Sequence, residues 1–227
     1  MALAAGLIFY KRMHPAALRL LVPFLLITCL IEGFAYFGLF RNAGLNKNFF
    51  YAGFFLLQLI VFWRLFGRMI KRERYNRFLN LVLAASLILS AVTLYGWGTG
   101  KLNPYFVNVV CVSMISYGAS YYYLIYNSQD IRYFRKEPLF WISTGIIFVN
   151  FIQLLFIYVT LIESFRSSTA NTDVFKILNT TGNLIYYSCI IYGFICSSTS
   201  LKRAGTWSGP HRFLFYCLFY LFSFTAK

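Results

Sequence analysis

Residues 138–162 read PLFWISTGIIFVNFIQLLFIYVTLI, a run without Asp, Glu, Lys or Arg. The hydrocarbon core of a bilayer is about 30 Å thick, and a helix needs about 20 apolar residues to cross it. This run is therefore long enough to span a membrane with some tilt. Three further runs of similar length are equally free of charge, at residues 78–100, 102–129 and 177–201.

The composition of the whole chain agrees with a membrane protein. Hydrophobic residues make up 59% of the 227 residues and charged residues 12%, whereas soluble domains are about a quarter charged. Two more runs carry few charges: residues 20–40 contain Glu32, and residues 48–70 contain Arg64 and Arg68 near one end. Because long basic side chains can extend to the interface, the second of these runs is still expected to span.

Both ends of the chain are apolar but shorter than a span. Residues 1–10 would reach only about 15 Å as a helix, which predicts either a short first helix or a start further upstream. Residues 213–226, within an aromatic tail at 204–227, are expected to form an interfacial segment or a partial eighth helix. The sequence therefore predicts an all-α fold, a polytopic transmembrane bundle of about seven helices over residues 1–203.

The basic residues predict the orientation of this bundle. With the amino terminus outside, fifteen of the 21 Lys and Arg residues fall in inner segments and five in outer ones. The inner segments are residues 11–19, 64–77, 132–136 and 202–212. Because cytoplasmic loops are enriched in Lys and Arg, we expect a multi-pass protein of the cell inner membrane with its basic loops in the cytoplasm.

The same distribution argues against a nucleic-acid partner. A net charge of +15 is common among nucleic-acid-binding proteins, but here the charges lie in short loops between apolar runs. The sequence contains no Cys-x-x-Cys pair, no His cluster, no Gly-rich phosphate loop and no Gly-x-Ser-x-Gly sequence. We therefore expect no metal, no cofactor and no enzymatic activity.

Glu32 is the acidic residue that lies well inside a predicted span. A charged carboxylate is unfavourable in hydrocarbon, so this group must be neutral, paired or hydrated. One interpretation makes it a ligand contact or a proton-coupled site. The other makes it a protonated carboxyl that hydrogen bonds to a neighbouring helix, and the sequence favours neither.

Amide side chains occur in four other predicted spans. Two pairs of them are three or four residues apart and so share one face of their helix. With Glu32, the amides can line one polar cavity, or they can form interhelical hydrogen bonds that only hold the bundle together, which is the commoner use of such residues. The candidates are Gln58, Asn108, Asn150, Gln153, Asn179 and Asn183.

A basic block lies at the end of the run at residues 48–70 and in the segment after it. Lys and Arg near an anionic surface contribute about 1 kcal/mol each to membrane attraction, so this block is expected to contact anionic lipid headgroups. The simpler interpretation is that it only fixes the orientation. The block extends from Arg64 to Arg77, and the residues of its loop expected to face the lipid are Arg68, Lys71, Arg72, Arg74 and Arg77.

Five tyrosines lie close together within residues 117–126. Tyr is enriched at membrane interfaces, where its ring can lie in the apolar region and its hydroxyl in water. We therefore expect an interfacial belt at this end of the helix. Lining of a cavity is the alternative.

The order of several short sequences resembles a known group of proteins. These are Tyr-Lys-Arg at residues 10–12, Leu-Arg-Leu-Leu at 18–21, a helix carrying Glu32, and Glu-Pro-Leu-Phe-Trp-Ile at 137–142. Over residues 1–203 the chain resembles a large group of uncharacterised bacterial seven-helix membrane proteins that are associated with histidine-kinase signalling. The short first helix and the aromatic tail depart from that group.

Three functions remain open at this level. The odd number of helices, the outside amino terminus and the absence of internal repeats favour a sensory or receptor-like module that acts through a separate signalling protein. A proton-coupled or small-solute transporter or channel is the alternative, suggested by Glu32 and the amides. A membrane accessory subunit without a small ligand is the third.

Overall fold

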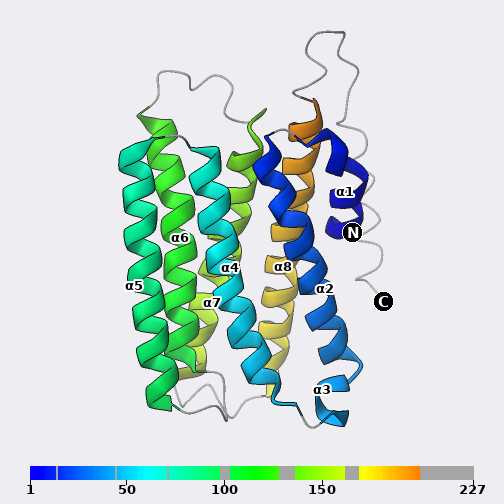
Figure 1. Ribbon diagram of the computed structural model, residues 1–227. Helices are drawn as coiled ribbons and strands as arrows, with labels where there is room; N and C mark the ends of the chain where they lie inside the picture. Colours follow the sequence, from blue (N-terminus) through cyan, green and yellow to red (C-terminus); the bar gives the residue numbers. More distant parts are fainter. Residues whose placement is uncertain are drawn as a thin grey trace.

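The computed structural model describes residues 1–13, 15–43, 45–70, 72–97, 103–127, 136–161 and 169–199, and this part of the chain is helical without any strand. Two short 3-10 segments, η1 (Tyr10–Arg12) and η2 (Ala16–Leu20), connect α1 to α2. The predicted all-α bundle with a short first helix is confirmed (Figure 1). The α-helices are α1 (Ala2–Phe9), α2 (Leu21–Tyr36), α3 (Leu39–Asn42), α4 (Lys47–Met69), α5 (Glu73–Trp97), α6 (Pro104–Tyr126), α7 (Pro138–Leu161) and α8 (Thr169–Thr199).

Many of these helices are long enough to cross a bilayer. α8 is the longest, with 31 residues. The apolar composition and the length of the helices identify the chain as an integral membrane protein. Among the described residues, five segments are both long and apolar enough to span: Ala16–Tyr36, Lys47–Met69, Glu73–Tyr95, Pro104–Tyr126 and Pro138–Tyr158.

Asparagine caps fix where two of the spans begin. At the start of α4, Asn46 Oδ1 accepts the backbone N–H of Asn48 at 3.0 Å. At the start of α6, Asn103 Oδ1 accepts the backbone N–H of Tyr105 at 2.8 Å. Pro104 follows at the first helical position, where a missing N–H has no consequence. Both caps satisfy backbone donors that the start of a helix leaves unpaired.

Two helices begin earlier than the uncharged runs predict. α5 begins at Glu73 instead of residue 78, and α8 begins at Thr169 instead of residue 177. In α5 the added turn carries an ion pair between Glu73 and Arg77, four residues apart on the helix surface. The absence of charge marks the hydrocarbon core alone, whereas helical hydrogen bonds continue into the polar interface.

The second span ends earlier than predicted. α2 stops at Tyr36, although the apolar run continues to residue 40. Gly38 has φ of +66°, a left-handed conformation that ends helices and that glycine adopts without strain. Glu32 is therefore four residues from the end of α2, which is about 6 Å of helix, and not at its centre.

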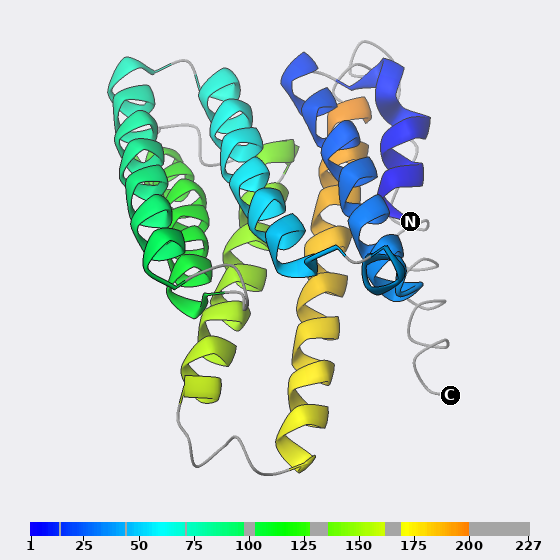
Figure 2. The ribbon, with the colours of Figure 1, turned by 60° about the horizontal axis from the view of Figure 1, so that its bottom comes forward.

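Six helices form a closed ring. Each helix packs against the next in the order α1, α2, α4, α6, α7, α8, and α8 packs in turn against α1. α5 lies outside this ring, against α4 and α6 (Figure 2). The main partners of α2 are α1 and α4, and not α8 across the ring. This arrangement leaves room for side chains to line internal space between α2 and α8.

Glycines allow the helices of the α6, α7 and α8 wall to approach closely. A Cβ atom at Gly118 on α6 would lie 2.7 Å from Cγ1 of Ile147 on α7. A Cβ atom at Gly145 on α7 would lie 2.9 Å from Cβ of Cys189 on α8. Small residues at such crossings are typical of membrane helices, because packing replaces the hydrophobic effect as the driving force.

The expectation of an interfacial tyrosine belt is right only in part. Tyr123 and Tyr126 are exposed, as a belt requires. Tyr117 and Tyr121 are buried in the bundle instead, and the hydroxyl of Tyr121 donates to Oε2 of Glu137 at 2.7 Å. Tyr117 and Tyr121 are four residues apart and lie on the same face of α6, which packs into the bundle.

The described basic segments gather at one end of the bundle, the upper end in Figure 1. α1, α4 and α6 end there, and α2, α5 and α7 begin there. The compartment that this end faces stays a prediction. Lys71, Arg132, Arg135 and residues 200–227, with the predicted tail at 204–227 and the apolar segment at 213–226, lie outside the described residues.

Candidate functional site

A cavity of about 490 Å³ lies within the ring, between α2, α4, α7 and α8. It runs from Lys47, the first residue of α4, to Gln58 near the middle of that helix. Its size falls within the range of small-molecule binding sites. Five of the residues singled out from the sequence line it: Glu32, Gln58, Gln153, Asn179 and Asn183.

Glu32 supplies a carboxylate to this cavity from the last turn and a half of α2. Its side chain is exposed and makes no ion pair or hydrogen bond with the other described residues. The phenols of Tyr51 and Tyr187 lie near enough to interact electrostatically with it. The carboxylate is therefore hydrated or available to a ligand. The described residues include no hydrogen bond from Glu32 to a neighbouring helix, which the alternative interpretation requires.

Lys47 supplies a cation to the same cavity from the start of α4. Its side chain is exposed, and no salt bridge joins it to Glu32. Lys47 is one of the five Lys and Arg residues that the predicted orientation assigns to the outer side, and a single Lys at the edge of an apolar run gives no sign that it faces inward. The closure of the ring by α2 and α4 brings both charges to one cavity.

Most amides of the cavity have no hydrogen-bond partner among the described residues. Gln58, Asn179 and Asn183 make no side-chain hydrogen bond to the rest of the described chain. Oε1 of Gln153 accepts a weak hydrogen bond from Sγ of Cys111 at 3.4 Å. Interhelical hydrogen bonds would be expected if these amides only held the bundle together, and three of the four make none.

Two of the predicted amides lie outside the cavity. Nδ2 of Asn150 donates to the carbonyl oxygen of Ile146 at 2.8 Å, one turn back on its own helix, and its side chain is buried. Oδ1 of Asn108 is buried without a partner among the described residues. Asn150 and Gln153 share a face of α7 only approximately, because three residues turn a helix by 300° and not by 360°.

Tyr186 is a site residue that the sequence reasoning missed. It lines the cavity from α8, and its side chain is buried with 6% exposure. Its hydroxyl has no hydrogen-bond partner in the described part of the protein. A buried hydroxyl without a partner is unfavourable, so this phenol is ready to bond a ligand or a water molecule.

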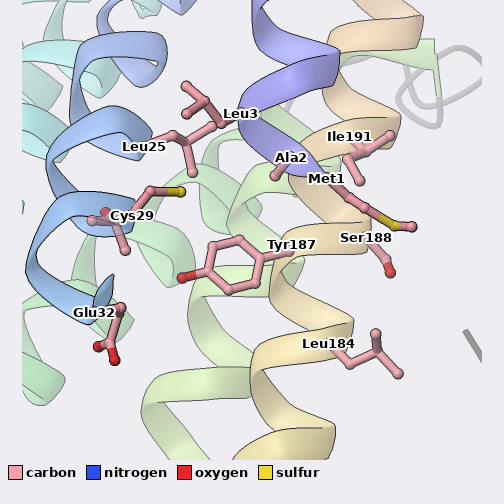
Figure 3. A pocket seen from close by; sticks show the side chains of 11 residues that line it. Met1, Ala2, Leu3, Leu25, Cys29, Glu32, Leu184, Tyr187, Ser188 and Ile191 are labelled. Atoms are coloured by element: carbon pink, nitrogen blue, oxygen red, sulfur yellow. The ribbon is translucent and has the colours of Figure 1, made fainter. Parts of the chain in front are cut away.

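A second, apolar cavity of about 340 Å³ adjoins the first between α1, α2 and α8. Thr28, Glu32 and Tyr187 line both cavities. Figure 3 shows the Tyr187 hydroxyl reaching from α8 toward α2, between Cys29 and Glu32. Glu32 and Tyr187 therefore separate a polar compartment from an apolar one.

The basic block predicted to face anionic lipid lies at the opposite end of the bundle, at the start of α5 and the end of α4. Arg68, Arg72, Arg74 and Arg77 are exposed there. Lys71 lies outside the described residues. The polar cavity and the basic block are thus separate features.

No family model, curated protein or solved structure matches this chain. The functional argument therefore rests on the cavity itself. Its particular feature is a carboxylate and an ammonium that line one space with three amides, none of them paired with another described residue.

Proposed function

We propose that this integral membrane protein is a receptor-like module that binds a small zwitterionic solute, such as an amino acid, in the polar cavity. The observation that carries the proposal is the presence of Glu32 and Lys47 in one cavity without an ion pair between them. A ligand with both charges would pair with each of them.

The chemistry of recognition follows from these groups. Glu32 would accept hydrogen bonds from a ligand ammonium, and Lys47 would donate to a ligand carboxylate. Charge-assisted hydrogen bonds of this kind are about twice as strong as neutral ones. The hydroxyl of Tyr186 and the amides of Asn179 and Asn183 would bond the polar part of the ligand side chain.

The position of the cavity supports a receptor for an external ligand. The cavity reaches the end of the bundle where α4 begins, and the basic segments lie at the other end. If the basic end faces the cytoplasm, as the excess of Lys and Arg predicts, the ligand enters from outside. The separate signalling protein implied by the resemblance to seven-helix proteins near histidine kinases would then contact the basic end.

A transporter is the second candidate, and the break of α2 at Gly38 is the observation that favours it. Many secondary transporters break helices at corresponding positions in two repeats. α7 and α8, which form the opposite wall of the cavity, are continuous over Pro138–Leu161 and Thr169–Thr199. The receptor-like function is therefore the better supported of the two.

The test is a thermal-unfolding screen of the purified protein in detergent with the standard amino acids at millimolar concentration. We expect zwitterions to raise Tm more than their singly charged analogues, the amino-acid amides and the N-acetyl amino acids. Equal shifts with all three classes would contradict the proposal. Uptake of the labelled ligand into proteoliposomes then separates the functions, because a receptor binds the ligand without transporting it.

A further inference from the structure

A third cavity, of about 330 Å³, lies between the end of α4 and the start of α5, at the basic end of the bundle. It is separate from the proposed ligand site. The residues that line it lie one turn apart on each helix, so that two short faces oppose each other. They are Trp63, Arg64, Gly67 and Arg68 on α4 and Asn76 and Asn80 on α5.

Trp63 holds the centre of this cavity in a fixed geometry. Its Nε1 donates to Oδ1 of Asn80 at 2.8 Å, and the Arg64 guanidinium lies 5.8 Å from its ring centroid, within the range of a cation–π contact. The bond from Trp63 uses the acceptor of the Asn80 amide and leaves its Nδ2 donor for another group. Tryptophan also prefers the level of the lipid headgroups.

The other polar groups of the cavity form no ion pair and no hydrogen bond with the described residues. Arg64 and Arg68 are exposed and form no ion pair. Oδ1 of Asn76 is buried without a hydrogen bond. A Cβ atom at Gly67 would lie in van der Waals contact with that oxygen, at 3.7 Å, so the lack of a side chain at Gly67 leaves room beside the oxygen for an atom of a ligand. The cavity thus combines two guanidinium groups without a carboxylate partner among the described residues, the Nδ2 donor of Asn80 and the unsatisfied buried acceptor of Asn76.

We propose that this cavity binds the headgroup of an anionic phospholipid that carries a hydroxyl, the chemistry of phosphatidylglycerol. Arg64 and Arg68 would hold the phosphate, which suits the planar guanidinium better than the compact ammonium of Lys. The glycerol hydroxyl would donate to Oδ1 of Asn76. The site shares Arg64 and Arg68 with the basic block predicted from the sequence, and differs from it by the polar groups of Trp63, Asn76 and Asn80, which form a cavity around them.

The test is native mass spectrometry of the full chain in detergent, titrated with dioleoyl phosphatidylglycerol and dioleoyl phosphatidylcholine. Wild type should bind the first lipid more tightly. Arg64→Gln with Arg68→Gln should weaken its binding by on the order of 100-fold, the loss of two charge-assisted hydrogen bonds to the phosphate. The matched control, Arg72→Gln with Arg74→Gln, removes the same charge from exposed positions that do not line the cavity. It should weaken lipid binding by less than about threefold.

Equal losses in the two double variants would overturn the proposal in favour of diffuse attraction to the basic block. Gly67→Leu fills the cavity without a change of charge and should also abolish the preference for phosphatidylglycerol, so unchanged binding by this variant would refute the location. Circular dichroism and size-exclusion chromatography check that each variant is folded. Displacement of the lipid by an equal concentration of inorganic phosphate would assign the cavity to free phosphate and overturn the lipid assignment.

Discussion

The carboxylate of Glu32 and the ammonium of Lys47 line one cavity and form no ion pair with each other. Glu32 comes from near the end of α2 and Lys47 from the start of α4, on the two sides of the turn that contains Gly38 and α3. Opposite charges this close in sequence would be expected to pair if they served only stability. Their separation leaves each of them available to a ligand.

Substitution of Glu32 is expected to weaken ligand binding without unfolding the protein, because its side chain is exposed to the cavity and pairs with none of the described residues. Glu32→Gln should weaken binding of the best amino acid in the thermal screen by about 10- to 100-fold, the loss of one charge-assisted hydrogen bond. Isothermal titration in detergent measures this. Glu73→Gln is the control, and full binding by both Glu32→Gln and Glu32→Leu would remove Glu32 from the site.

Replacement of Tyr186 by Phe is expected to weaken ligand binding without a loss of stability. The hydroxyl is buried without a partner, so its removal should leave the ligand-free protein equally stable or more stable. The ligand would lose one hydrogen bond and bind several-fold more weakly. Thermal unfolding with and without ligand measures both effects, and a less stable ligand-free variant would show that the hydroxyl bonds within the protein.

Reporter fusions test the orientation predicted from the basic segments. Fusions after Arg72, Arg135 and Arg203 should report cytoplasm, and fusions after Asn46, Lys101 and Ser168 should report the outside. A pair of reporters with opposite requirements, alkaline phosphatase and green fluorescent protein, gives each site an internal control. A reversed pattern at two or more of the six sites would contradict the orientation.

The crossing of α7 and α8 is expected to be sensitive to a single methyl group. Gly145→Ala places a Cβ atom 2.9 Å from Cβ of Cys189 and 3.3 Å from the carbonyl oxygen of Tyr186, so overpacking should destabilise the bundle by about 1–3 kcal/mol. Gly53→Ala on α4 is the control, since nothing lies within 4 Å of its added atom. Tm in detergent should fall only for Gly145→Ala, and equal Tm values would contradict the close packing.

The hydrogen bond from Tyr121 to Glu137 is expected to hold α6 against the start of α7. Tyr121→Phe leaves the carboxylate without this donor and should destabilise the protein by about 1.5–3 kcal/mol, the range for a hydrogen bond to a charged group. Tyr123→Phe, at an exposed position of the same helix, should have no effect on Tm. If both variants unfold at the wild-type temperature, the bond does not contribute to stability.

Several features of the fold could be predicted from the sequence because they depend on local composition. Uncharged runs of about 20 residues identify spans whatever their neighbours are, since the bilayer is the solvent. The start of α6 at Pro104 also depends on local sequence, because Asn at the cap and Pro at the first helical position both favour a helix start. The early starts of α5 and α8 could not be predicted in this way, because helical hydrogen bonds continue beyond the apolar residues that reveal a span.

The candidate site shows where sequence reasoning reaches its limit. Glu32, Gln58 and Asn183 stand out in the sequence because a polar group in an apolar run is rare and needs a reason. Which of the polar groups meet was decided by the closing of the ring, which brings Glu32, Lys47 and Tyr186 to one cavity and turns Asn150 away from it. The physical reason is that burial in lipid is a property of each segment, whereas the facing of side chains depends on how each helix is rotated against its neighbours, and only the tertiary packing sets that rotation.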